Sequence, residues 1–121
     1  MPVVVIIFVN MMNFVEMNQS AEEASRLLKA LANPDRLLIL CNLAEGERNV
    51  TELEDLLEMR QPTLSQQLAR LRADHLVDTR RDGKAIYYRL ASAEASAVIK
   101  LLYELFCAPA ARSAKRVAKQ A

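Results

Sequence analysis

Apolar residues recur every three to four positions along most of this chain, and the pattern predicts a run of amphipathic helices. The first helix is predicted to begin at Ser20, because Ser20 and Glu23 have the spacing of a capping box. Asn33 followed by Pro34 predicts the cap and the first position of a second helix, and Gly46 ends that helix. The chain is therefore expected to open with two helices joined by a tight break.

Two further helices are expected to follow closely. The first is short and covers residues 50–58, with Thr51 as its cap. A three-residue turn separates it from a fourth helix over residues 61–72, whose leucines fall on one stripe. A short helix, a tight turn and a helix with a polar outer face are typical of a helix-turn-helix.

The pattern changes after the fourth helix. Residues 76–81 and 84–90 are β-prone, and the Asp-Gly dipeptide between them is a strong hairpin signal. A last helix is expected over residues 92–106, ended by Pro109. Apolar residues cover more than half of its circumference, so we expect it to pair with the first helix in a dimer interface. The predicted fold class is mainly α with one β-hairpin, in the order α-α-α-α-β-β-α.

The face of the fourth helix opposite its leucines is polar and carries no acid. Hydroxyl, amide and guanidinium side chains of this kind suit base edges and phosphates in a DNA major groove. The candidate DNA-binding residues on this helix are Gln61, Thr63, Ser65, Gln66, Gln67 and Arg70. We expect Ser65, Gln66 and Gln67 to face base edges. Thr63 and Arg70 are expected nearer the DNA backbone. The alternative is the solvated face of an ordinary amphipathic helix.

The distribution of charge favours the DNA interpretation. The 121 residues fit one domain and carry a net charge of only +1, but residues 60–90 hold seven Lys and Arg against three Asp. Arg81 and Lys84 flank the hairpin tip, where cations can reach phosphates or an adjacent minor groove. The alternative for a charged tip is solubility and protection of the sheet edge. A local basic patch on a nearly neutral chain is typical of a protein that binds a polyanion.

The two ends of the chain fall outside this pattern. Residues 1–19 form an N-terminal extension with a continuous apolar run, which is too short to span a membrane and has no signal-peptide features. The preferred interpretation is that translation starts at Met12 or Met17. The alternative is an apolar arm that packs on a partner subunit. Residues 108–121 form a basic tail, which leaves residues 20–107 as the DNA-binding and dimerisation domain.

The composition offers few residues for sensor or catalytic chemistry. Cys41 and Cys107 form no Cys-x-x-Cys pair and the chain has one His, so we expect no metal site and no cofactor. The absence of a resolving cysteine at that spacing also disfavours a thiol oxidoreductase, and we expect no enzyme activity. Two lone cysteines in a cytoplasmic protein are either inert core thiols or a redox switch.

Three motifs together resemble the ArsR family of winged-helix repressors, over roughly residues 20–107. They are L-K-A-L-A-N-P-D-R-L at the first helix junction, Q-P-T-L-S-Q-Q-L-A-R-L-R in the fourth helix, and R-R-D-G-K-A-I-Y-Y-R-L, which resembles the family's wing. Within the family, Cys41 and Cys107 resemble the thiol pair of the sulfide-responsive BigR and SqrR type. The ligand sets of the metal-sensing branches are missing from the third and last predicted helices.

This resemblance implies a homodimeric repressor that binds palindromic operator DNA when reduced. It implies release when reactive sulfur species link Cys41 to Cys107. Direct disulfide closure needs Cα atoms within roughly 7 Å, and extra sulfur atoms in the bridge relax that limit. A lowered thiol pKa would help, because the thiolate is the reactive form. The alternatives are a response to general oxidants, or inert cysteines and no inducer.

Overall fold

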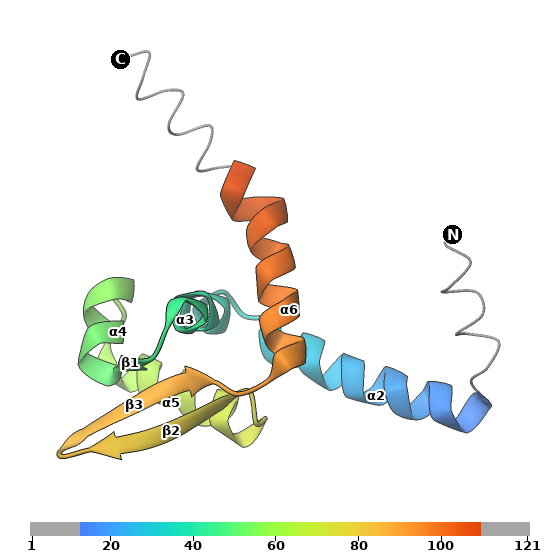
Figure 1. Ribbon diagram of the computed structural model, residues 1–121, viewed down its shortest axis with the longest axis horizontal. Coiled ribbons are helices and arrows are strands. Elements are labelled where there is room, and N and C mark those ends of the chain that lie inside the picture. The colour runs from blue at the N-terminus through green and yellow to red at the C-terminus, as the bar shows by residue number, and fades with distance from the viewer. Residues whose placement is uncertain (1–12, 110–121) are drawn as a thin grey trace, which may run out of the picture.

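The computed structural model describes residues 13–109 as a small helical body from which two helices project (Figure 1). Its elements are α2 (Phe14–Leu31), α3 (Pro34–Glu45), β1 (Arg48–Asn49), α4 (Val50–Leu57), α5 (Gln61–Ala73), β2 (Val77–Asp82), β3 (Ala85–Leu90), α6 (Ala93–Leu102) and the π-helix η1 (Tyr103–Cys107). The predicted winged helix-turn-helix is confirmed. Residues 1–12 and 110–121 lie outside the described part, and with them most of the N-terminal extension and of the basic tail.

Two predicted helix starts are wrong. Helix α2 begins earlier than expected, because Asn13 accepts a hydrogen bond from the Glu16 backbone N–H at 2.8 Å in its own capping box, which leaves Ser20 inside the helix. Helix α4 is capped by Asn49, whose Oδ1 lies 2.8 Å from the Glu52 backbone nitrogen, rather than by Thr51. In both cases an Asn three residues before a Glu satisfies the free N–H groups upstream of the predicted cap, about two turns upstream in α2 and less than one turn in α4.

The wing is a three-stranded antiparallel sheet in the order β1-β3-β2. Strand β1 adds Arg48 and Asn49 opposite Tyr88 and Tyr87, which the sequence did not predict. At the tip, Asp82 pairs with Ala85, so Gly83 and Lys84 are the two turn residues, where Asp82 and Gly83 had been expected. Only Gly83 has a positive φ, at 62°, which fits a type II′ turn with glycine first.

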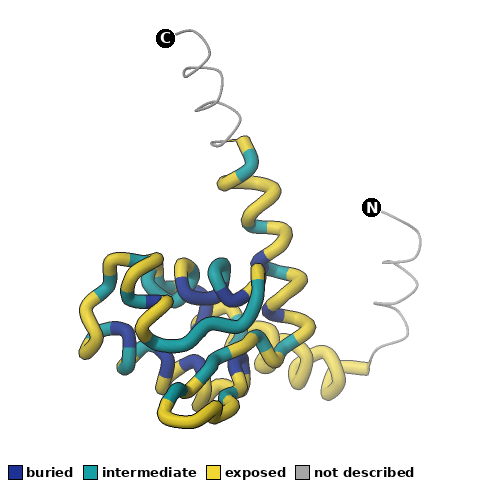
Figure 2. Tube along the Cα trace, turned by 60° about the vertical axis from the view of Figure 1, so that its left-hand side comes forward, coloured by how far each residue is buried: buried dark blue, intermediate teal, exposed yellow. Residues whose placement is uncertain are grey.

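The core lies under the helix-turn-helix. Three leucines of α5 face it, as their spacing predicted, and Ile39 and Leu40 of α3 meet them. The largest fully buried side chains are Ile39, Leu40, Leu53, Leu64, Leu68, Leu71 and Val77. Figure 2 shows this buried centre and, in contrast, the exposed projecting parts of α2 and α6. Within the described residues, no helix is both long and apolar enough to cross a bilayer.

Candidate DNA interface and thiol pair

Helix α5 presents Gln66 directly away from the core. At about 100° per residue, Gln66 lies about 160–220° around the helix from the buried stripe of Leu64, Leu68 and Leu71, and it is exposed. Ser65 and Thr63 lie on opposite flanks of this face and are half-buried. The polar face predicted from the sequence is therefore present, with Gln66 at its centre.

The start of α5 is open to an anion. Side chains of Asn13, Asn33, Asn49 and Ser92 cap α2, α3, α4 and α6, whereas Arg60 at the start of α5 makes no side-chain cap bond. Pro62 has no N–H and the Leu64 N–H donates to the Arg60 carbonyl at 2.9 Å, so the N–H groups of Gln61 and Thr63 are the ones left for another acceptor. A DNA phosphate is such an acceptor, because helix N-termini combine free N–H groups with a positive dipole end.

Four of the predicted DNA-binding side chains of α5 have partners within the chain, and two of them, Gln61 and Ser65, bind each other. Gln61 donates from Nε2 to Ser65 Oγ at 2.6 Å, and Arg70 donates from Nε to Asp74 Oδ2 at 2.9 Å. Gln67 accepts a hydrogen bond on Oε1 from Arg36 Nη1 at 3.0 Å. Exposed pairs such as Arg70–Asp74 stabilise by only about 0–1 kcal/mol, so a phosphate can compete for Arg70. The bond from Arg36 holds the Gln67 amide in one orientation, which restricts the base contacts that Gln67 can make.

Arg80 is a wing cation that is not free for DNA. Its guanidinium binds both carboxylate oxygens of Glu47, with Nε at 2.8 and 2.9 Å, and lies 4.6 Å from the centre of the Tyr87 ring. The hydrogen bond from Arg80 lowers the pKa of the Glu47 carboxyl. This contact fastens the wing to the segment between α3 and β1.

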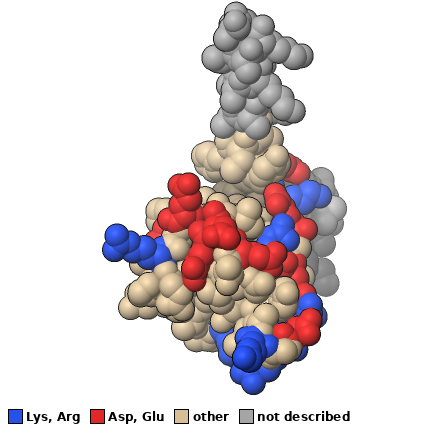
Figure 3. Space-filling model, turned by 90° about the vertical axis from the view of Figure 1, so that its left-hand side faces the viewer, with Lys and Arg blue, Asp and Glu red and all other residues tan. Residues whose placement is uncertain are grey.

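The two cations at the hairpin tip are available. Arg81 and Lys84 are exposed, and within residues 13–109 neither forms an ion pair. Figure 3 shows acidic side chains across the middle of the face that carries α4 and basic ones at its lower edge. The count of basic residues in the sequence thus overstated how many positive charges are free. The two cations predicted at the hairpin tip are exposed and can reach a DNA backbone.

The two cysteines are free thiols in different surroundings. Cys41 is half-buried on α3 against the core, and Cys107 is exposed at the end of η1. Burial raises the pKa of the Cys41 thiol, and the charges of Cys107 and Glu45 raise it further. The fold therefore does not activate Cys41, contrary to the lowered pKa that would favour reaction. The influence of Cys107 on Cys41 also indicates that the two thiols are near each other.

The π-helix determines which way Cys107 faces. In a regular α-helix, the residue seven positions after buried Ile99 shares its face, and that residue is Phe106. A π-turn closes i to i+5 and takes up one extra residue, so Cys107 moves close to that place. Phe106 turns outward and is 69% exposed. Since α6 packs against α3 through this face, the register brings Cys107 to the side of the last helix that carries Ile99, where its thiol is exposed.

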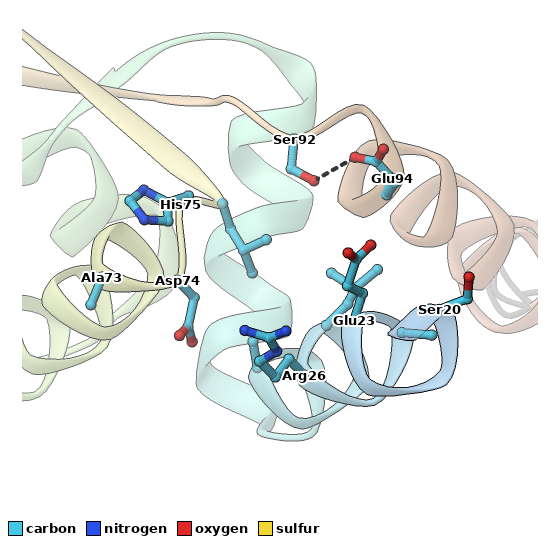
Figure 4. Close-up of a pocket in the computed structure, with 12 residues that line it drawn as sticks. Ser20, Glu23, Arg26, Ala73, Asp74, His75, Ser92 and Glu94 are labelled. Atoms are coloured by element: carbon cyan, nitrogen blue, oxygen red, sulfur yellow. Dashed lines mark hydrogen bonds between the residues drawn. The ribbon is translucent and has the colours of Figure 1, made fainter. Parts of the chain in front are cut away.

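An open groove of about 780 Å³ lies between α2, the turn after α5 and the start of α6 (Figure 4). Glu23 and Arg26 from α2, Asp74 and His75 from the turn after α5, and Glu94 from α6 border it. The lining mixes both signs of charge. Across the described part of the chain, no group of three or more His, Cys, Asp or Glu side chains is arranged to hold a metal ion.

Comparisons with known proteins agree with this architecture. Residues 33–79 match the bacterial regulatory protein arsR family. The chain is 55% identical to the Biofilm growth-associated repressor of Agrobacterium fabrum over 77% of its own length and 80% of that protein. The crystal structure of the transcriptional repressor BigR from Xylella fastidiosa aligns with a TM-score of 0.72 at 47% identity, over 79% of this chain and 98% of that one.

A relative with a different name aligns equally well. The structure of reduced HlyU from Vibrio cholerae gives a TM-score of 0.73 at 48% identity, over 76% of this chain and 97% of that one. The HlyU sequence from the same species carries the name transcriptional activator and is 48% identical over 79% of this chain and 89% of its own length. These matches extend over the helices and the wing. The chain therefore belongs to the arsR family of bacterial regulatory proteins, which are winged-helix DNA-binding transcriptional regulators.

Proposed function

We propose that this protein is a homodimeric repressor that binds operator DNA when Cys41 and Cys107 are reduced. The observation that carries the DNA-binding part is the exposed Gln66 at the centre of the α5 polar face, together with the free cations Arg81 and Lys84 at the hairpin tip. Gln66 is suited to base edges, and the two wing cations to phosphates. The name repressor in the BigR relatives supports the direction of regulation.

Dimer formation through α2 and α6 is supported by apolar side chains that the chain itself does not cover. The exposed large apolar residues on α2, α6 and η1 are Phe14, Val15, Met17, Leu28, Leu101, Tyr103, Leu105 and Phe106. A patch of this kind on projecting helices is typical of an interface between subunits. A two-fold dimer would place the two α5 helices about one DNA turn apart, ~34 Å.

Release of DNA would follow from a bridge between the two thiols. The Cys107 thiolate, being exposed, takes the outer sulfur of a persulfide and releases a thiolate. A second persulfide can lengthen this sulfur chain. The Cys41 thiolate then attacks the chain and expels hydrosulfide, so the persulfide sulfur is reduced as the two thiols are oxidised. The bridge would tie α3, which supports α5, to the helix proposed to form the dimer.

The bridge would lower the affinity for DNA by changing the spacing of the two recognition helices, because both helices must fit the two half-sites of a palindromic operator at once. Allosteric couplings usually amount to ~1–3 kcal/mol, or roughly 5- to 150-fold in affinity. The raised pKa of Cys41 favours a second candidate, in which this thiol is inert and no inducer acts through it. A response to general oxidants is a third.

One set of measurements separates these candidates. DNA selected from a random pool by the reduced protein is titrated with wild type, Cys41→Ser and Cys107→Ser, before and after treatment with an organic persulfide or with hydrogen peroxide. We expect persulfide to release wild-type protein only, with mass spectrometry showing a Cys41–Cys107 crosslink and its number of sulfur atoms. Release of Cys107→Ser by persulfide would refute the crosslink, and release of wild type by peroxide would indicate a general oxidant sensor. No release by either reagent would indicate inert thiols.

A further inference from the structure

The Arg36 side chain lies where three helices meet. Its Nε donates to the Ala30 carbonyl at 2.5 Å, and its Nη2 donates to the Lys29 carbonyl at 3.2 Å, both in the last turn of α2. Its Nη1 donates to Gln67 Oε1 on α5 at 3.0 Å. One guanidinium therefore joins the end of α2, the start of α3 and the polar face of α5.

The local sequence fixes Arg36 in this position. Asn33 caps α3 by accepting from the Arg36 backbone N–H at 3.0 Å, and Pro34 pre-sets the first helical position. The last carbonyls of α2 lack partners within their own helix, and a cation near them is favoured by the helix dipole. Arg36 is half-buried, so water competes only partly for these bonds.

The contact decides what Gln67 can offer to DNA. Arginine has hydrogen-bond donors only, so the Gln67 atom that faces it must be the oxygen. The two N–H bonds of Nε2 and the second lone pair of Oε1 remain for recognition. A bidentate contact with adenine needs both the oxygen and the nitrogen of the amide on one base. The bond from Arg36 therefore fixes the orientation of the Gln67 amide, and with it the directions in which Gln67 can donate to and accept from a base.

We propose that Arg36 is a positioning residue for sequence recognition, which holds the Gln67 amide in one orientation and so sets the base preference at the base pair that Gln67 faces. This inference rests on the proposed reading of DNA by α5. The rival is that Arg36 only stabilises the junction of α2 and α3. The two differ in one observable: a purely structural role affects all DNA sequences alike, whereas a positioning role changes preference at one base pair of each half-site.

The test measures base preference at every operator position by selection from a random DNA pool. The variants are Arg36→Met, Gln67→Ala and the double variant, with Arg48→Met as control, since Arg48 is a half-buried arginine that also donates to a backbone carbonyl. We expect Arg36→Met to change the base preference roughly 5- to 150-fold at the position that Gln67→Ala also affects. The double variant should lose that change, and Arg48→Met should show none. Uniform loss of affinity in Arg36→Met, or a shift that persists without Gln67, would overturn the proposal.

A second variant keeps the test valid if Arg36→Met does not fold. Gln67→Glu still accepts from Arg36 but has no N–H to donate, so we expect preference at the same position to disappear while thermal stability is retained. Unchanged preference in Gln67→Glu would contradict the proposal. If the wild-type protein selected no sequence at all, the proposed function would fail, whereas failure of the variants alone would refute only the role of Arg36.

Discussion

Replacing Leu105 by Ala should weaken the proposed dimer, and the exposed fraction of the Leu105 side chain determines by how much. Leu105 is 57% exposed at the end of the last helix. Complete burial of a leucine side chain is worth about 1.5–3 kcal/mol, so covering the remaining surface contributes ~0.9–1.7 kcal/mol per subunit. Both subunits contribute equally in a two-fold dimer, giving ~2–3 kcal/mol. The dissociation constant should therefore rise by up to about 20- to 200-fold.

Leu56 provides the matched control for this measurement. It is 56% exposed, but it lies on α4, at the far side of the body from α2 (Figure 1). Sedimentation equilibrium of wild type, Leu105→Ala and Leu56→Ala over a range of concentrations gives the three dissociation constants. Equal constants for the two variants, or a wild-type monomer that still binds its selected DNA tightly, would refute dimerisation through the last helix.

Three further changes test the other contacts. Moving the exposed thiol one position, in Phe106→Cys combined with Cys107→Ser, should abolish persulfide crosslinking to Cys41, as checked by mass spectrometry, because the thiol turns by roughly 100° around the helix. Equal crosslinking in both proteins would contradict the role of the π-turn. Glu47→Gln should lower the melting temperature near pH 7 but not near pH 3. A carboxyl whose pKa is depressed in the folded state stabilises the fold above its unfolded pKa of about 4.3. This contribution is lost as pH falls through the folded pKa. A difference that persisted at acid pH would assign another role to Glu47. Lys84→Ala should weaken DNA binding to all sequences and reduce the salt dependence of binding by about one ion. Gln66→Ala should instead relax the sequence preference, at a cost of about 1–3 kcal/mol in binding free energy. The reverse pattern in salt-dependent titrations would mean that the wing reads the sequence and the helix binds phosphates.

Features that depend on residues a few positions apart were predicted correctly from the sequence. The leucine stripe of α5, the Asn33 cap with Pro34, and the end of α3 at Gly46 are all local patterns. The helix starts at Ser20 and Thr51 were wrong for a local reason too. Each had a competing Asn–Glu capping box just upstream, and sequence alone did not rank the two caps.

The roles of individual polar residues were less predictable, because they depend on partners far away in the chain. Arg80 was counted with the free cations, but Glu47, which is 33 positions away, neutralises it. Gln67 was expected to face a base freely, but Arg36, which is 31 positions away, occupies its oxygen. Both partners come from elements whose relative placement is fixed only when the core packs.

The sequence by itself therefore determined the main helices and the hairpin, which face of α5 is polar and which cysteines are present. The physical reason is that hydrophobic periodicity and capping act within one or two helical turns. The tertiary structure alone decided which polar groups remain free, because the packing of α3 against α5 and α6 brings distant side chains within bonding distance. It also decided where Cys107 points, since a single π-turn before it changes the register of the last helix without any local signal that the sequence analysis detected.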